Sequence, residues 1–206
     1  MKKSAFTLAE VLITLGVIGV VSAITLPIIH SKIQNYVLKN RFKKVYNTYY
    51  SAIQMIYTEN GYNFDCAYGD NFNWSGCPNF FRELAKNLKY TKYCQNNALS
   101  NGCIPKYTKY YRIDGLDCLG FQEQSINTKS RAWILNDGSI MFTYTNGNAP
   151  LFAVDINGFS KPNKGGYDLF VFNIINQGNA LKLDGTNCSD SFKDTGGKTV
   201  REMLMN

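Results

Sequence analysis

The first third of the chain carries the strongest hydrophobic pattern. Residues 8–29 form an apolar run of 22 residues whose single ionisable side chain is Glu10. As an α-helix with about 1.5 Å rise per residue, this run is about 33 Å long, close to the roughly 30 Å hydrocarbon core of a bilayer. The pattern predicts a membrane-spanning helix over residues 6–30.

The apolar pattern then changes from continuous to one-sided. Over residues 31–58, apolar side chains recur at steps of three and four, with lysines and polar residues between them. This spacing places them on one face of a helix and predicts that the same helix continues in amphipathic form, ending near Asn60-Gly61. The expected buried face comprises Ile33, Val37, Leu38, Phe42, Val45, Tyr46, Tyr49, Ile53 and Ile56.

The rest of the chain predicts one short helix and then strands. Pro78 opens a helix that carries Phe80, Phe81, Leu84 and Leu88, and a loop is expected from about residue 90 to 105. Alternating segments predict strands over 132–135, 139–144, 151–156 and 168–175, with an edge strand over 180–183. Between the first two, Asn136-Asp137-Gly138 is typical of a hairpin turn.

The predicted fold class is therefore α+β. A long N-terminal helix, membrane-spanning in its first half and amphipathic in its second, is expected to pack on a C-terminal antiparallel sheet of four or five strands. The predicted domains are the spanning half over 6–30, the amphipathic half over 31–58 and a disulfide-containing globular head over 59–206. The sequence contains no repeat or low-complexity stretch.

Charge is distributed unevenly between these parts. Residues 1–58 hold seven basic side chains and one acid, whereas the remainder holds 15 basic and 14 acidic residues, so six of the seven net positive charges belong to the first part. A nearly neutral head gives little reason to expect nucleic-acid binding. Tyr107, Tyr110 and Tyr111 lie among basic residues and could stack on single-stranded nucleic acid, but a strand edge with solvated lysines is favoured.

All six cysteines lie beyond the apolar run, and none forms a C-x-x-C pair. An even number downstream of an export-like segment predicts disulfides in an oxidising compartment rather than zinc ligands. Six cysteines allow 15 pairings. The preferred set is Cys66 with Cys77, Cys94 with Cys103, and Cys118 with Cys188, because the first two pairs close short loops.

The extreme N-terminus combines Lys2, Lys3 and the small residue Ala5 with the stretch Phe6-Thr7-Leu8-Ala9-Glu10. An ordinary secretory signal also has basic residues before an apolar run, and Val21-Ser22-Ala23 offers a cleavage site for it. Two observations disfavour that alternative: Glu10 interrupts the apolar region, and the helical pattern continues through the cleavage site.

These residues resemble the class III leader of type IV pilins and of type II secretion pseudopilins. The resemblance implies a pilin-like fold, a leader peptide over residues 1–5, cleavage by a prepilin peptidase between Ala5 and Phe6, and methylation of the new amino group. Counted from Phe6, Glu10 is the fifth residue, as in the family. One departure is Ala5, where the family usually has Gly.

The resemblance also implies roles within the apolar run. Glu10 would pair with the α-amino group of Phe6 on a neighbouring subunit, which would offset the cost of an acid in a membrane helix. The alternative is a solvated carboxylate at headgroup depth, favoured by the helix dipole. Gly16, Gly19 and Pro27 are either ordinary membrane-helix residues or points of helix flexibility during assembly.

Two sequence signals disagree about the side of the membrane on which the head lies. Five basic residues follow the span and outnumber Lys2 and Lys3, which by the positive-inside rule would place the head in the cytoplasm. The cysteines and the leader favour the opposite side. We therefore expect a single-pass protein of the bacterial inner membrane with its head outside the cytoplasm.

A second stretch, Asp155 to Phe172, resembles a C-terminal region of major pseudopilins, where the loop between two strands often binds calcium. Asp155, Asn157 and Asp168 could supply oxygen ligands to Ca²⁺. The alternative, which we favour, is that these residues form Asx turns without an ion. No other cofactor is expected.

The expected function is that of a structural subunit, not an enzyme. The chain has no Walker loop, G-x-S-x-G or paired-histidine motif, and its one histidine, His30, lies at the expected membrane edge. The resemblance implies assembly into a type IV pilus or type II secretion pseudopilus, with other subunits, the prepilin peptidase, the inner-membrane assembly platform and the membrane as partners. The alternatives are a secreted, disulfide-stabilised binding protein and, more remotely, a secreted enzyme.

Overall fold

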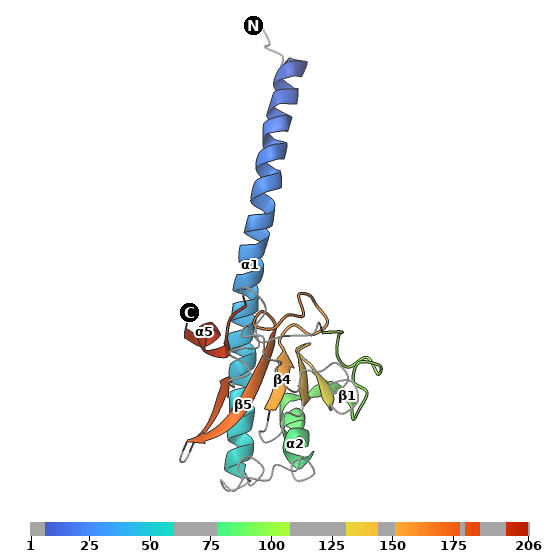
Figure 1. Cartoon of the computed structure of the whole chain (residues 1–206), viewed down its shortest axis with the longest axis vertical. Coiled ribbons are helices and arrows are strands. Elements are labelled where there is room, and N and C mark those ends of the chain that lie inside the picture. Colours follow the sequence, from blue (N-terminus) through green and yellow to red (C-terminus); the bar gives the residue numbers. More distant parts are fainter. Residues whose placement is uncertain are drawn as a thin grey trace, which may run out of the picture. The chain divides into compact units, whose positions relative to one another are not determined.

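The computed structural model describes residues 7–59, 78–107, 131–143, 151–177, 180–185 and 197–205. Its elements in chain order are α1 (Leu8–Glu59), α2 (Pro78–Leu88), β1 (Tyr90–Cys94), β2 (Ala132–Leu135), β3 (Ile140–Thr143), β4 (Leu151–Asp155), β5 (Leu169–Gln177), β6 (Ala180–Gly185) and α5 (Val200–Met205) (Figure 1). The chain divides into two compact units, which we call the N-terminal unit (Met1–Val37) and the C-terminal unit (Leu38–Asn206).

The sheet is a six-stranded antiparallel meander in the order β1-β2-β3-β4-β5-β6. Its last five strands confirm the predicted strands and the α+β class. The first strand corrects the loop expected from residue 90, because Tyr90 pairs with Leu135 and Cys94 with Ala132. Four of the five β1 side chains are exposed, so β1 is defined by its backbone pairing to β2 and leaves little hydrophobic signal in the sequence.

The predicted hairpin turn is present between β2 and β3. Gly138 has φ 81°, a conformation that glycine adopts without a steric penalty. Asp137 Oδ1 accepts hydrogen bonds from the Ser139 backbone N–H at 2.9 Å and from Ser139 Oγ at 2.6 Å, so the side chain fixes the turn locally. The turn and the two strands it joins follow directly from the local sequence.

One face of the sheet is covered by the second half of α1, as predicted. Phe42 lies against Phe170, with ring centroids 4.5 Å apart, and Tyr49 stacks on Phe152 at 5.8 Å. Tyr46 adds a polar tie, because its hydroxyl donates to the Leu183 carbonyl at 2.9 Å. The buried residues of α1 are Phe42, Val45, Tyr49, Ala52, Ile53, Ile56 and Tyr57.

The start of this buried face was predicted wrongly. Ile33 and Val37 were expected on it, but they belong to the N-terminal unit and remain 56% and 53% exposed, and Leu38 is only partly buried. Helical spacing shows which residues share a face, but not where along the helix another element covers that face.

The other face of the sheet is also covered, which the hydrophobic pattern did not predict. Ala98, Cys103 and Ile104, from the segment after β1, pack in a second buried cluster with residues of β3 and β5 such as Phe142 and Val171. The strands therefore bury both faces. Along β4, Phe152 and Val154 belong to the cluster that contains α1, whereas Ala153 belongs to the second cluster.

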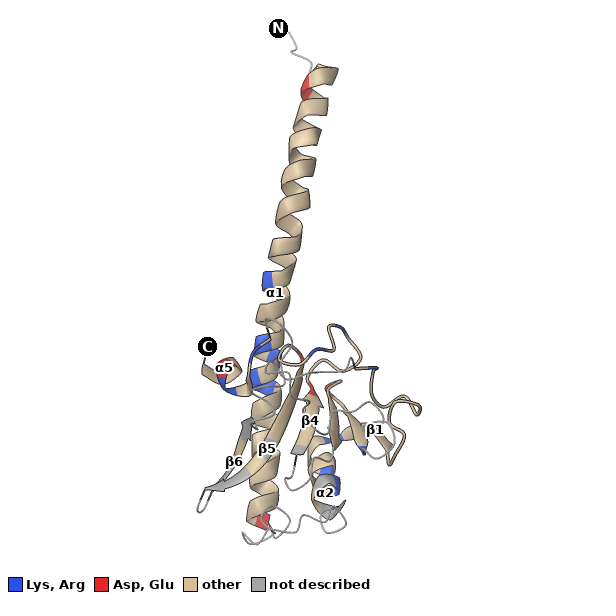
Figure 2. Cartoon of the chain, viewed as in Figure 1, with Lys and Arg blue, Asp and Glu red and all other residues tan. Residues whose placement is uncertain are grey.

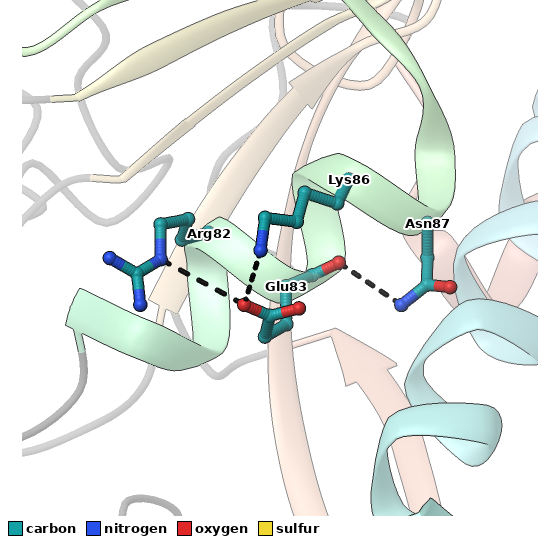
Figure 3. Close-up of polar contacts among 4 residues, drawn as sticks. All are labelled: Arg82, Glu83, Lys86 and Asn87. Carbon is teal, nitrogen blue, oxygen red and sulfur yellow. Dashed lines mark hydrogen bonds and ion pairs between the residues drawn. The ribbon is translucent and has the colours of Figure 1, made fainter.

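The predicted helix at Pro78 is present as α2. Phe80, Leu84 and Leu88 are buried in the same cluster as the α1 residues. On the polar side of α2, Glu83 Oε1 lies 2.9 Å from Lys86 Nζ and 3.8 Å from Arg82 Nε, as Figure 3 shows. Exposed pairs of this kind contribute little to stability, because solvent screens them.

Candidate functional site

In the described part of the N-terminal unit, α1 presents an exposed apolar surface. The first half of α1 is long and apolar enough to cross a membrane, and none of its most apolar window is buried. Leu8 is 80% exposed, and eleven further Leu, Ile and Val side chains as far as Ile29 are each more than half exposed. Monomeric soluble proteins rarely expose contiguous apolar surfaces of this kind, so the surface indicates contact with lipid or protein.

Glu10 and Thr7 form a capping box at the start of this helix. Glu10 Oε2 accepts hydrogen bonds from the Thr7 backbone N–H at 2.8 Å and from Thr7 Oγ1 at 2.9 Å. In return, the Glu10 N–H donates to Thr7 Oγ1 at 3.3 Å. The two residues thus satisfy backbone donors that a helix N-terminus leaves unpaired.

The capping box gives Glu10 a local role in addition to the predicted pairing with a neighbouring subunit. Both hydrogen bonds reach the same oxygen, Oε2, and within the described residues Oε1 has no hydrogen-bond donor. The carboxylate therefore caps its own helix and keeps one oxygen available to a further donor. The signal in the sequence was the Thr-x-x-Glu spacing, which is typical of a capping box.

The remaining predicted residues of this segment have mixed outcomes. Ala5 and Phe6 lie outside the described residues. Gly16 and Gly19 are helical, and a Cβ added at either would meet nothing within 4 Å. Pro27 lies inside α1, which continues through it, although proline removes the hydrogen bond to the Ala23 carbonyl. Flexibility at these three positions stays a prediction.

The candidate calcium residues lie where β4 ends and β5 begins, and Asp155 and Asp168 are fully buried. Asp155 accepts hydrogen bonds from the Tyr107 hydroxyl at 3.0 Å and from the Asn157 N–H at 3.1 Å, one on each carboxylate oxygen. Asp168 accepts the N–H groups of Asn163 at 2.7 Å and Lys164 at 2.6 Å, also one on each oxygen.

This arrangement does not fit a calcium ion well. All four carboxylate oxygens already accept protein donors, and Asn157 Oδ1 is the one buried oxygen here without a hydrogen bond. Calcium requires six to eight oxygen ligands. Within the described residues, no three acidic, histidine or cysteine side chains form a group that could hold a metal. The geometry favours the Asx-turn interpretation.

Burial dominates the electrostatics of this loop. Loss of solvent raises the pKa of Asp155 well above its usual range, and the charge of Asp168 raises it further, against the opposing hydrogen bond from Tyr107. Burial also raises the pKa of Asp168, against the backbone N–H donors that lower it. The tie from Tyr107 joins residues 48 positions apart, so no local sequence signal could have predicted it.

One predicted disulfide is present. Cys94 and Cys103 are bonded, with Cα atoms 6.2 Å apart, and Cys103 is fully buried in the second cluster. Lys92 Nζ donates to the carbonyls of Asn101 at 2.7 Å and Gly102 at 3.2 Å, and these bonds add a second link across the loop that the disulfide closes. The other four cysteines, Cys66, Cys77, Cys118 and Cys188, lie outside the described residues.

Comparison of the chain with known protein families, with curated proteins and with solved structures finds no match.

Proposed function

We propose that this chain is a pilin-like structural subunit, anchored in the membrane by the first half of α1 and assembled into a filament of the type IV pilus or type II secretion kind. The observation that carries the proposal is the exposed apolar helix of the N-terminal unit, which has one acid, Glu10, at its start. The N-terminal residues 2–10, which resemble a class III leader, support the same interpretation.

The exposed apolar surface needs an environment other than water. Before assembly, lipid supplies that environment, because the helix has the length and composition of a single span. In a filament, the same surface packs against equivalent helices of neighbouring subunits. A subunit of this kind moves from one apolar environment to the other, so its apolar surface must stay uncovered by its own chain.

Glu10 sets the register of assembly in this proposal. Cleavage between Ala5 and Phe6 creates an α-amino group, and Glu10 of an incoming subunit accepts that amine from its neighbour. Oε1 is the oxygen left for it, since Oε2 receives both Thr7 donors. A charge-assisted bond in an apolar environment is stronger than one in water, which makes the pair selective for one axial position.

The proposed partners follow from this assignment. A prepilin peptidase processes the precursor, an inner-membrane assembly platform extracts it, and other pilin or pseudopilin subunits receive it. In this proposal the C-terminal unit lies outside the cytoplasm. There the Cys94–Cys103 disulfide is not exposed to the reductants of the cytosol.

The first experiment identifies the mature N-terminus by mass spectrometry of the protein isolated from membranes. The expected N-terminal residue is methylated Phe6. A chain that begins at Ile24 would instead support the secreted binding protein released by ordinary signal peptidase. Retention of Met1 through Ala5 would contradict processing altogether.

The second experiment tests Glu10 in assembly. The Glu10→Ala variant should insert into the membrane and be cleaved, because neither step uses the pairing. It should be missing from filaments sheared off the cells, because the α-amino group of the neighbouring subunit has no acceptor. Glu59→Ala is a matched control, since Glu59 is the other acidic residue of α1 and lies at its far end. The pairing role is wrong if the Glu10 variant enters filaments as efficiently as the Glu59 variant.

A further inference from the structure

One end of the C-terminal unit is densely basic. This end is where α1 enters the unit at Leu38, where β2 turns into β3, where β4 leads to β5, and where α5 begins. Eight basic side chains from these elements define what we call the basic end: Lys39, Arg41, Lys43, Lys44, Lys161, Lys164, Lys198 and Arg201. Figure 2 shows the basic residues in the part of α1 that belongs to the C-terminal unit, and those of α5, at the same end of the sheet.

Three close contacts bring these elements together. Arg41 Nη2 donates to the Asp137 carbonyl in the β2–β3 turn at 3.0 Å. A Cβ added at Gly158, in the β4–β5 loop, would collide with the Gly138 carbonyl of that turn. The Lys198 N–H donates to the Gly166 carbonyl at 2.8 Å, which fixes the segment before α5 on the same loop. The basic side chains therefore belong to one contiguous part of the molecule.

The described acids at this end do not neutralise it. Asp155 and Asp168 are fully buried and bonded to backbone and tyrosine donors, and Glu202 caps α5 through the Thr199 N–H at 2.8 Å. Asp137 in the β2–β3 turn is exposed, with Oδ1 bonded to Ser139, and is outnumbered by the eight basic side chains. None of the eight basic side chains forms an ion pair with a described residue; the two ion pairs in the described part of the chain both involve Glu83 on α2. Lys44, Lys161, Lys164, Lys198 and Arg201 are exposed.

We propose that the basic end binds the anionic phospholipid headgroups of the membrane in which α1 is anchored, before the subunit is assembled. The inference rests on the proposed membrane anchor. Anionic surfaces attract basic residues within about a Debye length, and each lysine or arginine near the surface strengthens the contact about fivefold. Phe159, 52% exposed in the same loop as Lys161 and Lys164, offers an apolar side chain to the interface.

Chain connectivity favours a membrane over other anionic partners. Leu38, where α1 enters the basic end, is nine residues beyond Ile29, where the apolar run ends, so the chain holds Leu38 within about 30 Å of the bilayer. A tethered surface meets its partner at high effective concentration, so a few charges suffice. A nucleic acid would have to bind without such a tether. The rest of the C-terminal unit would add little attraction for it, because its basic and acidic residues are nearly equal in number.

The test measures amide hydrogen exchange of the full chain, one copy per nanodisc, in phosphatidylcholine alone and in phosphatidylcholine mixed with phosphatidylglycerol. Exchange over residues 157–166 and 197–201 should be slower in the anionic nanodiscs at low salt, and high salt should abolish the difference. Lys161→Gln combined with Lys164→Gln should lower the ratio of docked to undocked protein about 25-fold, at about fivefold per charge.

Arg82→Gln combined with Lys86→Gln is the matched control, because it removes two exposed charges from α2 and should leave the lipid effect intact. Equal exchange in both lipids would overturn the inference and leave the anchor standing, whereas failure to insert would overturn both. Protection that needs two copies per nanodisc, or that double-stranded DNA reproduces in neutral nanodiscs, would assign the basic end to a neighbouring subunit or to nucleic acid instead.

Discussion

The two units of this chain differ in the burial of their apolar helix side chains. Leu12 in the N-terminal unit is 62% exposed, whereas Phe42, thirty residues further along the same helix α1, is fully buried against β5. Both residues come from helical apolar patterns in the sequence. The difference lies in what the chain supplies: the C-terminal unit has a sheet to cover its helix face, and the N-terminal unit has no described element to do so.

The contrast separates internal stability from external binding. Apolar area buried within the C-terminal unit stabilises that unit directly, at roughly 25 cal/mol per Å². Apolar area left exposed in the N-terminal unit stabilises only a complex with lipid or with other helices. Mutations in the C-terminal unit should therefore change its stability, whereas mutations in the apolar helix should change binding to lipid or to other helices. The following predictions test that separation.

The largest expected effect is on packing beneath the sheet. Phe42→Ala should lower the free energy of unfolding of the C-terminal unit by about 3–5 kcal/mol, because it leaves a cavity against Phe170 and Phe172. Leu12→Ala should change it by less than about 0.5 kcal/mol. Chemical denaturation of the full chain in detergent micelles measures both, and equal effects would remove the distinction between the units.

The next largest effect concerns the loop of the C-terminal unit that the Cys94–Cys103 disulfide closes. Replacing Cys94 and Cys103 together by Ser should lower the free energy of unfolding by about 2–3 kcal/mol, the value expected for a short closed loop with a separation of 9 residues. The same denaturation experiment measures it, and the Leu12→Ala chain serves as the reference. An unchanged unfolding midpoint would show that Ala98 and Ile104 hold the loop without the disulfide.

A smaller effect sharpens the comparison, because both units contain the same capping box. Thr199 and Glu202 at α5 repeat the bonds of Thr7 and Glu10 at α1. Thr7→Val should weaken its helix start by about 1 kcal/mol, seen as roughly fivefold faster amide exchange in the first turn of α1. Thr7→Ser should restore slow exchange, since serine keeps the hydroxyl; if it does not, the methyl group rather than the cap is responsible.

The smallest expected effect is that of calcium. At about 100 times its Kd, calcium at a genuine site would stabilise the C-terminal unit by about 2.7 kcal/mol. We expect no measurable change in the melting temperature of the full chain in micelles, because the oxygens of Asp155 and Asp168 already accept protein donors. A rise that Asp168→Asn abolishes would restore the calcium interpretation.

Local patterns in the sequence determined a large part of this fold. The extent of α1, the start of α2 and the β2–β3 hairpin follow from periodicity, a proline and a turn glycine, which act over a few residues. The Cys94–Cys103 pair followed from short spacing. The Thr7–Glu10 capping box is equally local, and its Thr-x-x-Glu signal was present in the sequence although its role was not assigned.

Other features depend on which segments meet in space, and only the tertiary structure decided them. Strand β1 exists because β2 supplies its hydrogen-bond partners, and the buried face of α1 begins near Leu38 because the sheet covers α1 from there. The Tyr107–Asp155 bond and the basic end join residues far apart in the chain. A sequence read locally specifies backbone geometry and surface chemistry, whereas burial and long-range pairing require knowing where each segment lies.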